Sequence, residues 1–168
     1  MKHTLFFLCL IIGFLGGCGK PDSRETSGSA AASVKSVTSS EGVTTVYISG
    51  DDRMKFSLET FTVKSGDMVR IIFENKGKMP KAAMGHNVVF LVAEVNVNAF
   101  VTAASKARNH DYIPVELSAQ ILAHTKLLGP GERDTIEFTA PDVGEYAFIC
   151  SFPAHLFAGM RGMMTVEQ

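Results

Sequence analysis

Short runs of β-branched and aromatic residues, separated by turns that contain Gly, Asp or Ser, recur from residue 43 to the end of the chain. Such runs favour strands, because branched and aromatic side chains pack well on a pleated, half-buried surface. Ile136 and Phe138 alternate with polar residues, which indicates a strand with one buried face. The expected strands are 43–49, 54–63, 68–75, 86–92, 134–140, 144–150 and 162–167.

Residues 94–124 depart from this pattern and carry Ala, Leu, Gln and Lys at helix-like spacing. This composition predicts a helical flap inserted between two strands. Roughly seven to eight short strands with one helical insertion favour an all-β fold, a sandwich with Greek-key connections.

The chain begins with a short basic start and an apolar run over residues 5–15. The run is too short to cross a bilayer as a stable helix, so residues 1–17 are expected to be a signal peptide. Leu15–Gly16–Gly17–Cys18 resembles the lipobox of bacterial lipoproteins, in which the cysteine becomes the acylated first residue; an ordinary signal peptide cut nearby is the alternative. Because Gly19 is not aspartate, the outer membrane is the expected address in a two-membrane bacterium.

Residues 18–42 are expected to form the lipidated cysteine and a tether, since this segment is rich in Ser, Thr, Ala and Gly. A stretch so poor in bulky apolar residues cannot offset its ordering entropy by burial. Residues 43–168 then form one domain with a single core.

Charge and cysteine content exclude several classes of protein. The chain has 16 Lys and Arg against 17 Asp and Glu, with no basic stripe, so nucleic-acid binding is not indicated. Of its three cysteines, Cys9 leaves with the signal peptide and Cys18 is the lipidation site. Cys150 therefore has no disulfide partner and is either an inert core thiol or a functional one. A monomer is the default expectation.

The stretch CSFPAHLFAGM, residues 150–160, places a cysteine, a histidine and a methionine at C-x4-H-x4-M spacing. A second histidine, His86, begins one of the expected strands. Each residue alone has an ordinary structural explanation, but two imidazoles, a thiolate and a thioether together are the ligands of a trigonal copper site with a weak axial methionine. Met163 and Met164 are alternatives to Met160 as the thioether.

Residues 79–87, 123–134 and 146–162 resemble segments of azurin, in the same order, and the likeness to the cupredoxin family runs from about residue 46 to 166. The His-to-Met spacing is one residue longer than in azurins and is similar to that of auracyanins. The chain also lacks the disulfide typical of azurins. Asn75 stands where many azurins carry a pH-sensitive histidine, and Ala154 replaces the glycine before the second loop histidine.

The resemblance implies a type 1 blue copper site in a cupredoxin sandwich. Asn87 and the backbone N–H of Phe152 correspond to groups that hydrogen-bond the cysteine sulfur, a role that should raise the reduction potential. The implied ligands are His86, Cys150, His155, Met160 and, as a weak axial group, the backbone carbonyl of Gly85.

The expected function is one-electron transfer between redox proteins, with copper cycling between Cu(I) and Cu(II). In the mature chain, without His3 of the signal peptide, only His110 and His124 remain for a second metal site, which excludes a copper oxidase or nitrite reductase built from this chain alone. Copper delivery or sensing at the cell envelope is the alternative. The edge of His155 should reach the surface in an apolar patch for transient docking. The patch residues are Met84, Ala154, Leu156, Phe157 and Ala158.

Overall fold

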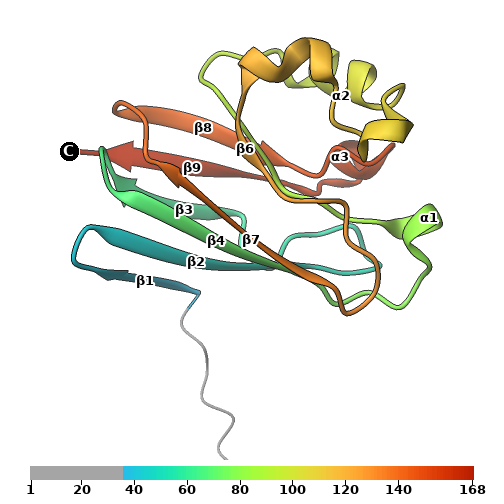
Figure 1. Ribbon diagram of the computed structural model, residues 1–168, viewed down its shortest axis with the longest axis horizontal. Coiled ribbons are helices and arrows are strands. Elements are labelled where there is room, and N and C mark those ends of the chain that lie inside the picture. The colour runs from blue at the N-terminus through green and yellow to red at the C-terminus, as the bar shows by residue number, and fades with distance from the viewer. Residues whose placement is uncertain (1–35) are drawn as a thin grey trace, which may run out of the picture. The chain divides into compact units, whose positions relative to one another are not determined.

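The computed structural model describes residues 36–168, which form two facing β-sheets with short helices packed beside the second sheet (Figure 1). The first sheet has the order β1 (Val37–Ser40), β2 (Val43–Gly50), β4 (Met68–Asn75) and β7 (Arg133–Thr139). The second has the order β3 (Thr60–Lys64), β9 (Arg161–Glu167), β8 (Gly144–Ile149), β5 (Val89–Leu91) and β6 (Ile121–His124). The predicted all-β Greek-key sandwich is confirmed.

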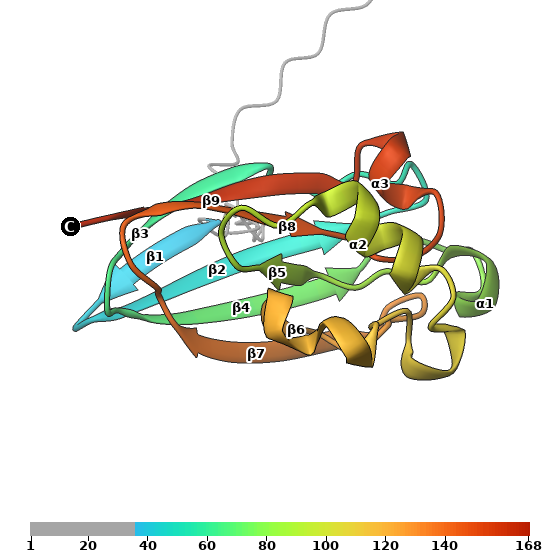
Figure 2. The same ribbon diagram turned by 90° about the horizontal axis from the view of Figure 1, so that it is seen from above.

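The predicted helical flap contains one α-helix and two 3-10 turns: α2 (Val97–Ala104), η1 (Arg108–His110) and η2 (Val115–Gln120). Two further one-turn helices, α1 (Lys81–Met84) and α3 (His155–Ala158), lie in the loops at one end of the sandwich (Figure 2). No helix among residues 36–168 is long and apolar enough to span a bilayer.

The central strands β2 and β4 run parallel, with Val46 opposite Ile71 and Gly50 opposite Asn75. Alternate residues of both strands are buried, as expected when one face of a sheet covers the core. This register brings Gly50 and Asn75 together at the last position of the ladder, at the end of the sandwich that carries α1 and α3.

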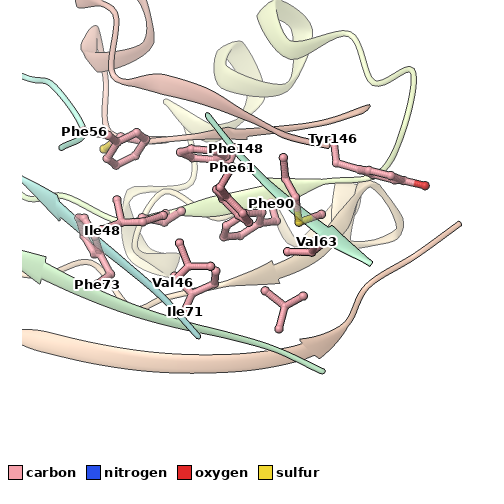
Figure 3. Packing of buried hydrophobic residues seen from close by; sticks show 14 of the residues in the cluster. Val46, Ile48, Phe56, Phe61, Val63, Ile71, Phe73, Phe90, Tyr146 and Phe148 are labelled. Carbon is pink, nitrogen blue, oxygen red and sulfur yellow. The ribbon is translucent and has the colours of Figure 1, made fainter. Parts of the chain in front are cut away.

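Aromatic side chains fill the space between the two sheets (Figure 3). The ring of Phe148 lies 5.5 Å from that of Phe56, 5.6 Å from that of Phe61 and 5.3 Å from that of Phe90, measured between centroids. Such tilted contacts add to the area that each ring buries. Phe148 belongs to β8, so this packing also fixes the strand that leads into residues 150–160.

The folded part extends at least to Val37, because β1 pairs with β2 through a hairpin. This strand lies inside 18–42, the segment that the sequence predicts to be a tether; residues 1–35, including Cys18, lie outside the described residues. The hairpin turns at Glu41 and Gly42, both with positive φ (50° and 76°). Two-residue turns of this kind favour Asn-Gly or Asp-Gly, so Glu-Gly gave a weak signal.

Three strand assignments differ from the prediction. The strand expected at 86–92 is shortened to β5, and His86 forms an isolated bridge with Leu128 outside it. Residues 54–59 of the expected strand 54–63 form bends and a single bridge from Phe56 to Gly50 instead. They follow a turn in which the carbonyl and carboxylate of Asp51 accept hydrogen bonds from the backbone N–H groups of Met54 (2.9 Å) and Arg53 (3.0 Å). At the end of the predicted flap, residues 121–124 form strand β6 paired with β5. The described residues therefore contain nine strands rather than seven or eight.

The flap packs on the second sheet through a small core of its own. Helix α2 begins at Asn96, whose side chain accepts a hydrogen bond from the N–H of Ala99 at 3.0 Å. It buries Phe100, Val101 and Ala104 together with residues of β5 and β8 and with Leu156 from α3. The flap and the loop 150–160 therefore share one apolar cluster.

Candidate metal centre

The predicted ligands His86, Cys150, His155 and Met160 come together at the end of the sandwich. His86 forms a two-way backbone bridge with Leu128, whose carbonyl accepts from His86 N–H at 3.1 Å and whose N–H donates to the His86 carbonyl at 2.7 Å. Cys150 directly follows β8, and His155 begins α3. The N–H of Cys150 donates to the Met160 carbonyl at 3.1 Å, which closes the loop 150–160 on itself.

Three donor atoms converge in this pocket. Nδ1 of His86 lies 3.2 Å from Nδ1 of His155, and Sγ of Cys150 lies 3.4 Å from the latter. One ligand atom from each residue lies within 4.8 Å of the others, and all three side chains are buried. Among residues 36–168 this is the one such group of His, Cys, Asp or Glu.

Met160 lies beside this group with no exposed surface. A methyl group added to Gly50 would collide with Cε of Met160 and would come within 3.3 Å of Cδ2 in the His86 ring. Both side chains therefore occupy the space above Gly50. Met164 is instead packed with the aromatic core between the sheets, and Met163 lies on β9 opposite Thr60.

Asn87 joins the His86 segment to the Cys150 segment. Its Oδ1 accepts a hydrogen bond from the N–H of Ser151 at 2.9 Å, and its Nδ2 donates to Oγ of Ser151 at 2.8 Å. The backbone N–H groups of Asn87 and Phe152 face the Cys150 sulfur and favour its ionised form. The resemblance implied that Asn87 and Phe152 contact the sulfur. The backbone N–H of Asn87 makes this contact, while its side chain binds Ser151.

Burial keeps the metal-free site neutral at pH 7. It raises the pKa of the Cys150 thiol to about 12, against the opposing effect of the facing N–H groups. Burial, reinforced by the neighbouring His86, lowers the pKa of His155 to about 4. The pKa of His86 is also lowered by burial, and the Asp51 carbonyl on its far side only partly offsets this. Both imidazoles are therefore unprotonated and present lone pairs.

This donor set fits a copper ion. Neutral imidazoles and a cysteine thiolate with a thioether nearby are the ligands of trigonal copper sites. Zinc sites use Cys, His, Asp and Glu, and a thioether is not among their usual ligands. Nε2 of His86 is buried and finds no well-aligned hydrogen-bond partner among the described residues. Gly85, the predicted source of a weak carbonyl ligand, is buried directly before His86.

Asn75 supports the His86 bridge from β4. It is fully buried, its Nδ2 donates to the Leu128 carbonyl at 2.9 Å, and its Oδ1 accepts from the N–H of Gly77 at 2.8 Å. The Leu128 carbonyl thus receives hydrogen bonds from both Asn75 and His86. Because a side-chain amide does not titrate, this support is independent of pH.

The predicted docking patch needs two corrections. Leu156 is only 4% exposed, because it is part of the flap core, and therefore cannot contribute to a surface. The edge of His155 does not reach solvent as expected, since this residue is 2% exposed and the Phe152 ring lies 4.6 Å from it, between centroids. Among the other predicted residues, Phe157 is 75% exposed. Ala154 is also exposed, and Met84 and Ala158 are half-buried.

Sequence reasoning missed three features of the site. Gly50 lies in a Ser-Gly-Asp turn signal that gave no hint of a metal pocket. Tyr112 in the flap contacts Phe152 edge to face at 4.9 Å between ring centroids, so the flap covers the loop that carries the ligands. Ala154 adopts a left-handed backbone with φ 70°, a conformation that costs a non-glycine residue about 1–2 kcal/mol. The replacement of glycine at this position was the signal for that strain.

Known proteins share the sequence pattern and the fold of this chain. The family model described as copper binding proteins, plastocyanin/azurin family, matches residues 43–167. Azurin of Alcaligenes faecalis is 39% identical over 127 residues, which cover 73% of this chain and 95% of that protein. Azurin of Pseudomonas aeruginosa is 33% identical over 126 residues, which cover 73% and 84%.

A solved structure extends the comparison. Dithionite-reduced auracyanin from the photosynthetic bacterium Roseiflexus castenholzii is similar with a TM-score of 0.67 and 35% identity. The similarity covers 74% of this chain and 97% of that one.

We expect Gly50→Ala to displace Met160 from its place beside His86, because the added methyl group has no free space. Overpacking of this kind costs about 1–3 kcal/mol, which urea unfolding of the metal-free protein would measure. The NMR signal of the Met160 methyl group should shift as well. The control is Gly144→Ala, where the nearest atom to the added methyl group is 3.5 Å away. A Gly50→Ala protein with unchanged stability and an unchanged Met160 signal would contradict this packing.

Proposed function

The chain belongs to the plastocyanin/azurin family of copper-binding proteins, and on that premise we propose a membrane-tethered carrier of single electrons with a His86–Cys150–His155 copper site. Membership of the family is shown and confirms the resemblance that the sequence indicates. Copper is accordingly the cofactor, and electron transfer between redox partners, rather than bond-making catalysis, is the activity. The tether, the individual ligands and the docking surface are the proposed parts.

The convergence of three buried donor atoms within 4.8 Å carries the ligand proposal. His86, Cys150 and His155 are the proposed equatorial ligands. Met160 and the Gly85 carbonyl are the proposed weak axial groups, the former supported by its position over Gly50. Bound copper supplies one-electron oxidation and reduction.

The residues around the site prepare and hold it. The Cys150 thiol must lose its proton to become a ligand, and the N–H groups of Asn87 and Phe152 stabilise the resulting thiolate. The Cys150–Met160 hydrogen bond and the Asn87–Ser151 pair restrain the two ligand segments. A restrained site changes little between oxidation states, which keeps the barrier to electron transfer low.

Burial of the ligands also favours the carrier over the alternative of copper delivery or sensing. His86, Cys150 and His155 are each at most 2% exposed. A metal ion that is handed to another protein needs ligands that the partner can reach. An electron, in contrast, can pass through side chains that cover the site. Delivery therefore has no supporting observation among the described residues.

We expect an intense visible thiolate-to-copper absorption band, with a narrow copper hyperfine splitting in EPR, when copper(II) is added to the chain without residues 1–18. Cys150→Ser should abolish both signals, because an alcohol does not supply the charge-transfer transition of a thiolate. Ordinary, weak copper spectra that survive in Cys150→Ser would refute the blue copper site.

Electrons are proposed to pass close to His155 at an apolar docking patch made of Met84, Ala154, Phe157 and Ala158. The strongly exposed ring of Phe157 supports this surface. Weak and short-lived docking on a small apolar area suits a carrier that must release its partner. Because His155 is covered, the Phe152 ring that lies against it belongs to the proposed route.

Ala158→Asp is expected to slow electron self-exchange about tenfold or more, because two approaching copies would each place a charge in an apolar contact. Stopped-flow mixing of oxidised and reduced protein would measure the rate. The visible spectrum should stay unchanged, since Ala158 is proposed to touch no ligand. Ser40→Asp is a control of equal charge, because Ser40 is exposed on β1 at the opposite end of the sandwich. An unchanged rate for Ala158→Asp would remove the patch from the proposal.

The membrane tether is proposed from the sequence of residues 1–35. Cys18 would carry the lipid, and the following Ser-, Thr-, Ala- and Gly-rich segment would let the domain swing between partners at the bacterial cell envelope, facing the periplasm. If the cell has two membranes, the outer one is the proposed site of the anchor.

We expect the full chain expressed in a bacterium to sediment with membranes and Cys18→Ser to move it to the soluble fraction, because the diacylglyceryl group on Cys18 would supply the two acyl chains that stable anchoring needs. Mass spectrometry of the N-terminal peptide would identify the diacylglyceryl group. Ser23→Ala serves as the control. Wild-type protein found wholly in the soluble fraction with an unmodified Cys18 would exclude the lipid anchor without affecting the copper site.

A further inference from the structure

A cleft of about 290 Å³ opens beside the metal centre. It lies where α1, η1 and the loop 150–160 approach one another. It is lined by Lys81, Ala82, Arg108, Tyr112, Leu127 and Phe152.

The walls of this cleft combine positive charge with apolar surface. Lys81 and Arg108 stand on separate elements, and both are exposed. Arg108 makes no ion pair among residues 36–168, and Lys81 reaches Glu132 only at 4.0 Å. A surface contact at that distance holds a lysine weakly, so both cations are available to an incoming anion. The Tyr112 and Phe152 rings provide an apolar wall for the stem of such a group.

Several acidic residues near this end of the molecule accept backbone hydrogen bonds, while Asp111, which precedes Tyr112, is exposed. The Asp52 carboxylate accepts from the N–H groups of Lys78 (2.8 Å) and Met79 (3.3 Å), and Asp134 accepts from the N–H of Lys126 (2.9 Å). Glu132, the neighbour of Lys81, accepts from the N–H of Gly129 at 2.7 Å. These carboxylates hold loops in place, and the cleft itself is lined by Lys81 and Arg108 and by no acidic residue.

The opposite end of the sandwich carries the reverse sign. Asp67, Asp142, Glu145 and Glu167 cluster at the strand ends there, with Lys64 as the basic residue on β3. Such a charge distribution orients an approaching acidic partner toward the copper end.

The cleft is separated from the ligands by one side chain. The Phe152 ring lies 4.6 Å from that of His155, and its backbone N–H faces the Cys150 sulfur. Helix α1, which supplies Lys81, also supplies Met84 of the docking patch. A group bound in the cleft is thus next to the proposed exit route of the electron.

We propose that this cleft receives the carboxylate of an acidic side chain that the redox partner presents beside its own redox centre. The carboxylate pairs with Lys81 and Arg108, and its aliphatic stem lies on Tyr112 and Phe152. This inference rests on the proposed electron-carrier function and names the partner's chemistry: a protein with an acidic rim around its electron-transfer site. The apolar patch supplies contact, and the cleft fixes the orientation.

The test is an NMR titration of the metal-free full domain, so that it needs no copper. The probes are the blocked peptides acetyl-Gly-Glu-Gly-amide and acetyl-Gly-Gln-Gly-amide, with succinate as a free small anion, all at equal ionic strength. We expect the Glu peptide alone to shift the amide signals of Tyr112, Phe152 and Arg108. Arg108→Gln and Lys81→Gln should each weaken its binding about five- to tenfold, the size expected of one charge-assisted pair.

Lys64→Gln, at the acidic end, removes the same charge and should leave the affinity for the Glu peptide unchanged. Equal weakening by Lys64→Gln and Arg108→Gln would mean that the affinity depends only on the net charge of the protein. That result would refute the cleft as the binding site. Succinate binding as tightly as the Glu peptide would make this a small-anion site instead. Absence of the blue copper spectra together with intact peptide binding would refute the electron-carrier function alone. Blue copper spectra without binding of the Glu peptide would refute the cleft alone.

Discussion

The hydrogen bonds between Asn87 and Ser151 join two parts of the chain that are 64 residues apart, and the metal centre depends on them. One partner follows His86, and the other follows Cys150. The pairing of β5 with β8 places Val89 opposite Ile149, and the Asn87–Ser151 bonds extend this link to the residues next to the ligands. The aromatic core fixes the strand before Cys150, and the Leu128 bridge fixes His86. The Asn87–Ser151 hydrogen bonds then hold these two segments at a fixed distance from each other.

Much of this arrangement could be predicted from the sequence, for physical reasons. Strands that alternate half-buried and exposed residues, such as β7 (Arg133–Thr139), carry their own periodic signal. One tight loop is enough to bring the members of the Cys-x4-His-x4-Met pattern together. The pattern therefore predicts a shared metal site without knowledge of the rest of the fold. The segment containing β6 gave a helical signal because Ala and Leu suit either state, and pairing with β5 decided the outcome.

Features made by tertiary contacts had no such signal. The sequence predicts that Leu156 belongs to a surface patch, yet the flap core buries it. The cover of Phe152 over His155 depends on a ring from the loop and a second ring from the flap. The basic cleft also could not be seen, since Lys81 and Arg108 are 27 positions apart (108 − 81) in a chain whose total charge is nearly balanced. The folded structure is needed to show that Lys81 and Arg108 line one cleft and that Arg108 forms no ion pair among residues 36–168.

The apolar cluster that Leu156 shares with α2 has a consequence for how the molecule opens. Proteins unfold locally in cooperative units, and residues that share a core open together. Because the ligand loop contributes Leu156 to the cluster beneath the flap, detachment of α2 also removes a support of His155, the residue directly before Leu156. The flap and the loop thus form one unit in hydrogen exchange. Entry and loss of the metal are then governed by the rare fluctuation that frees this unit, while the electron passes through the closed form.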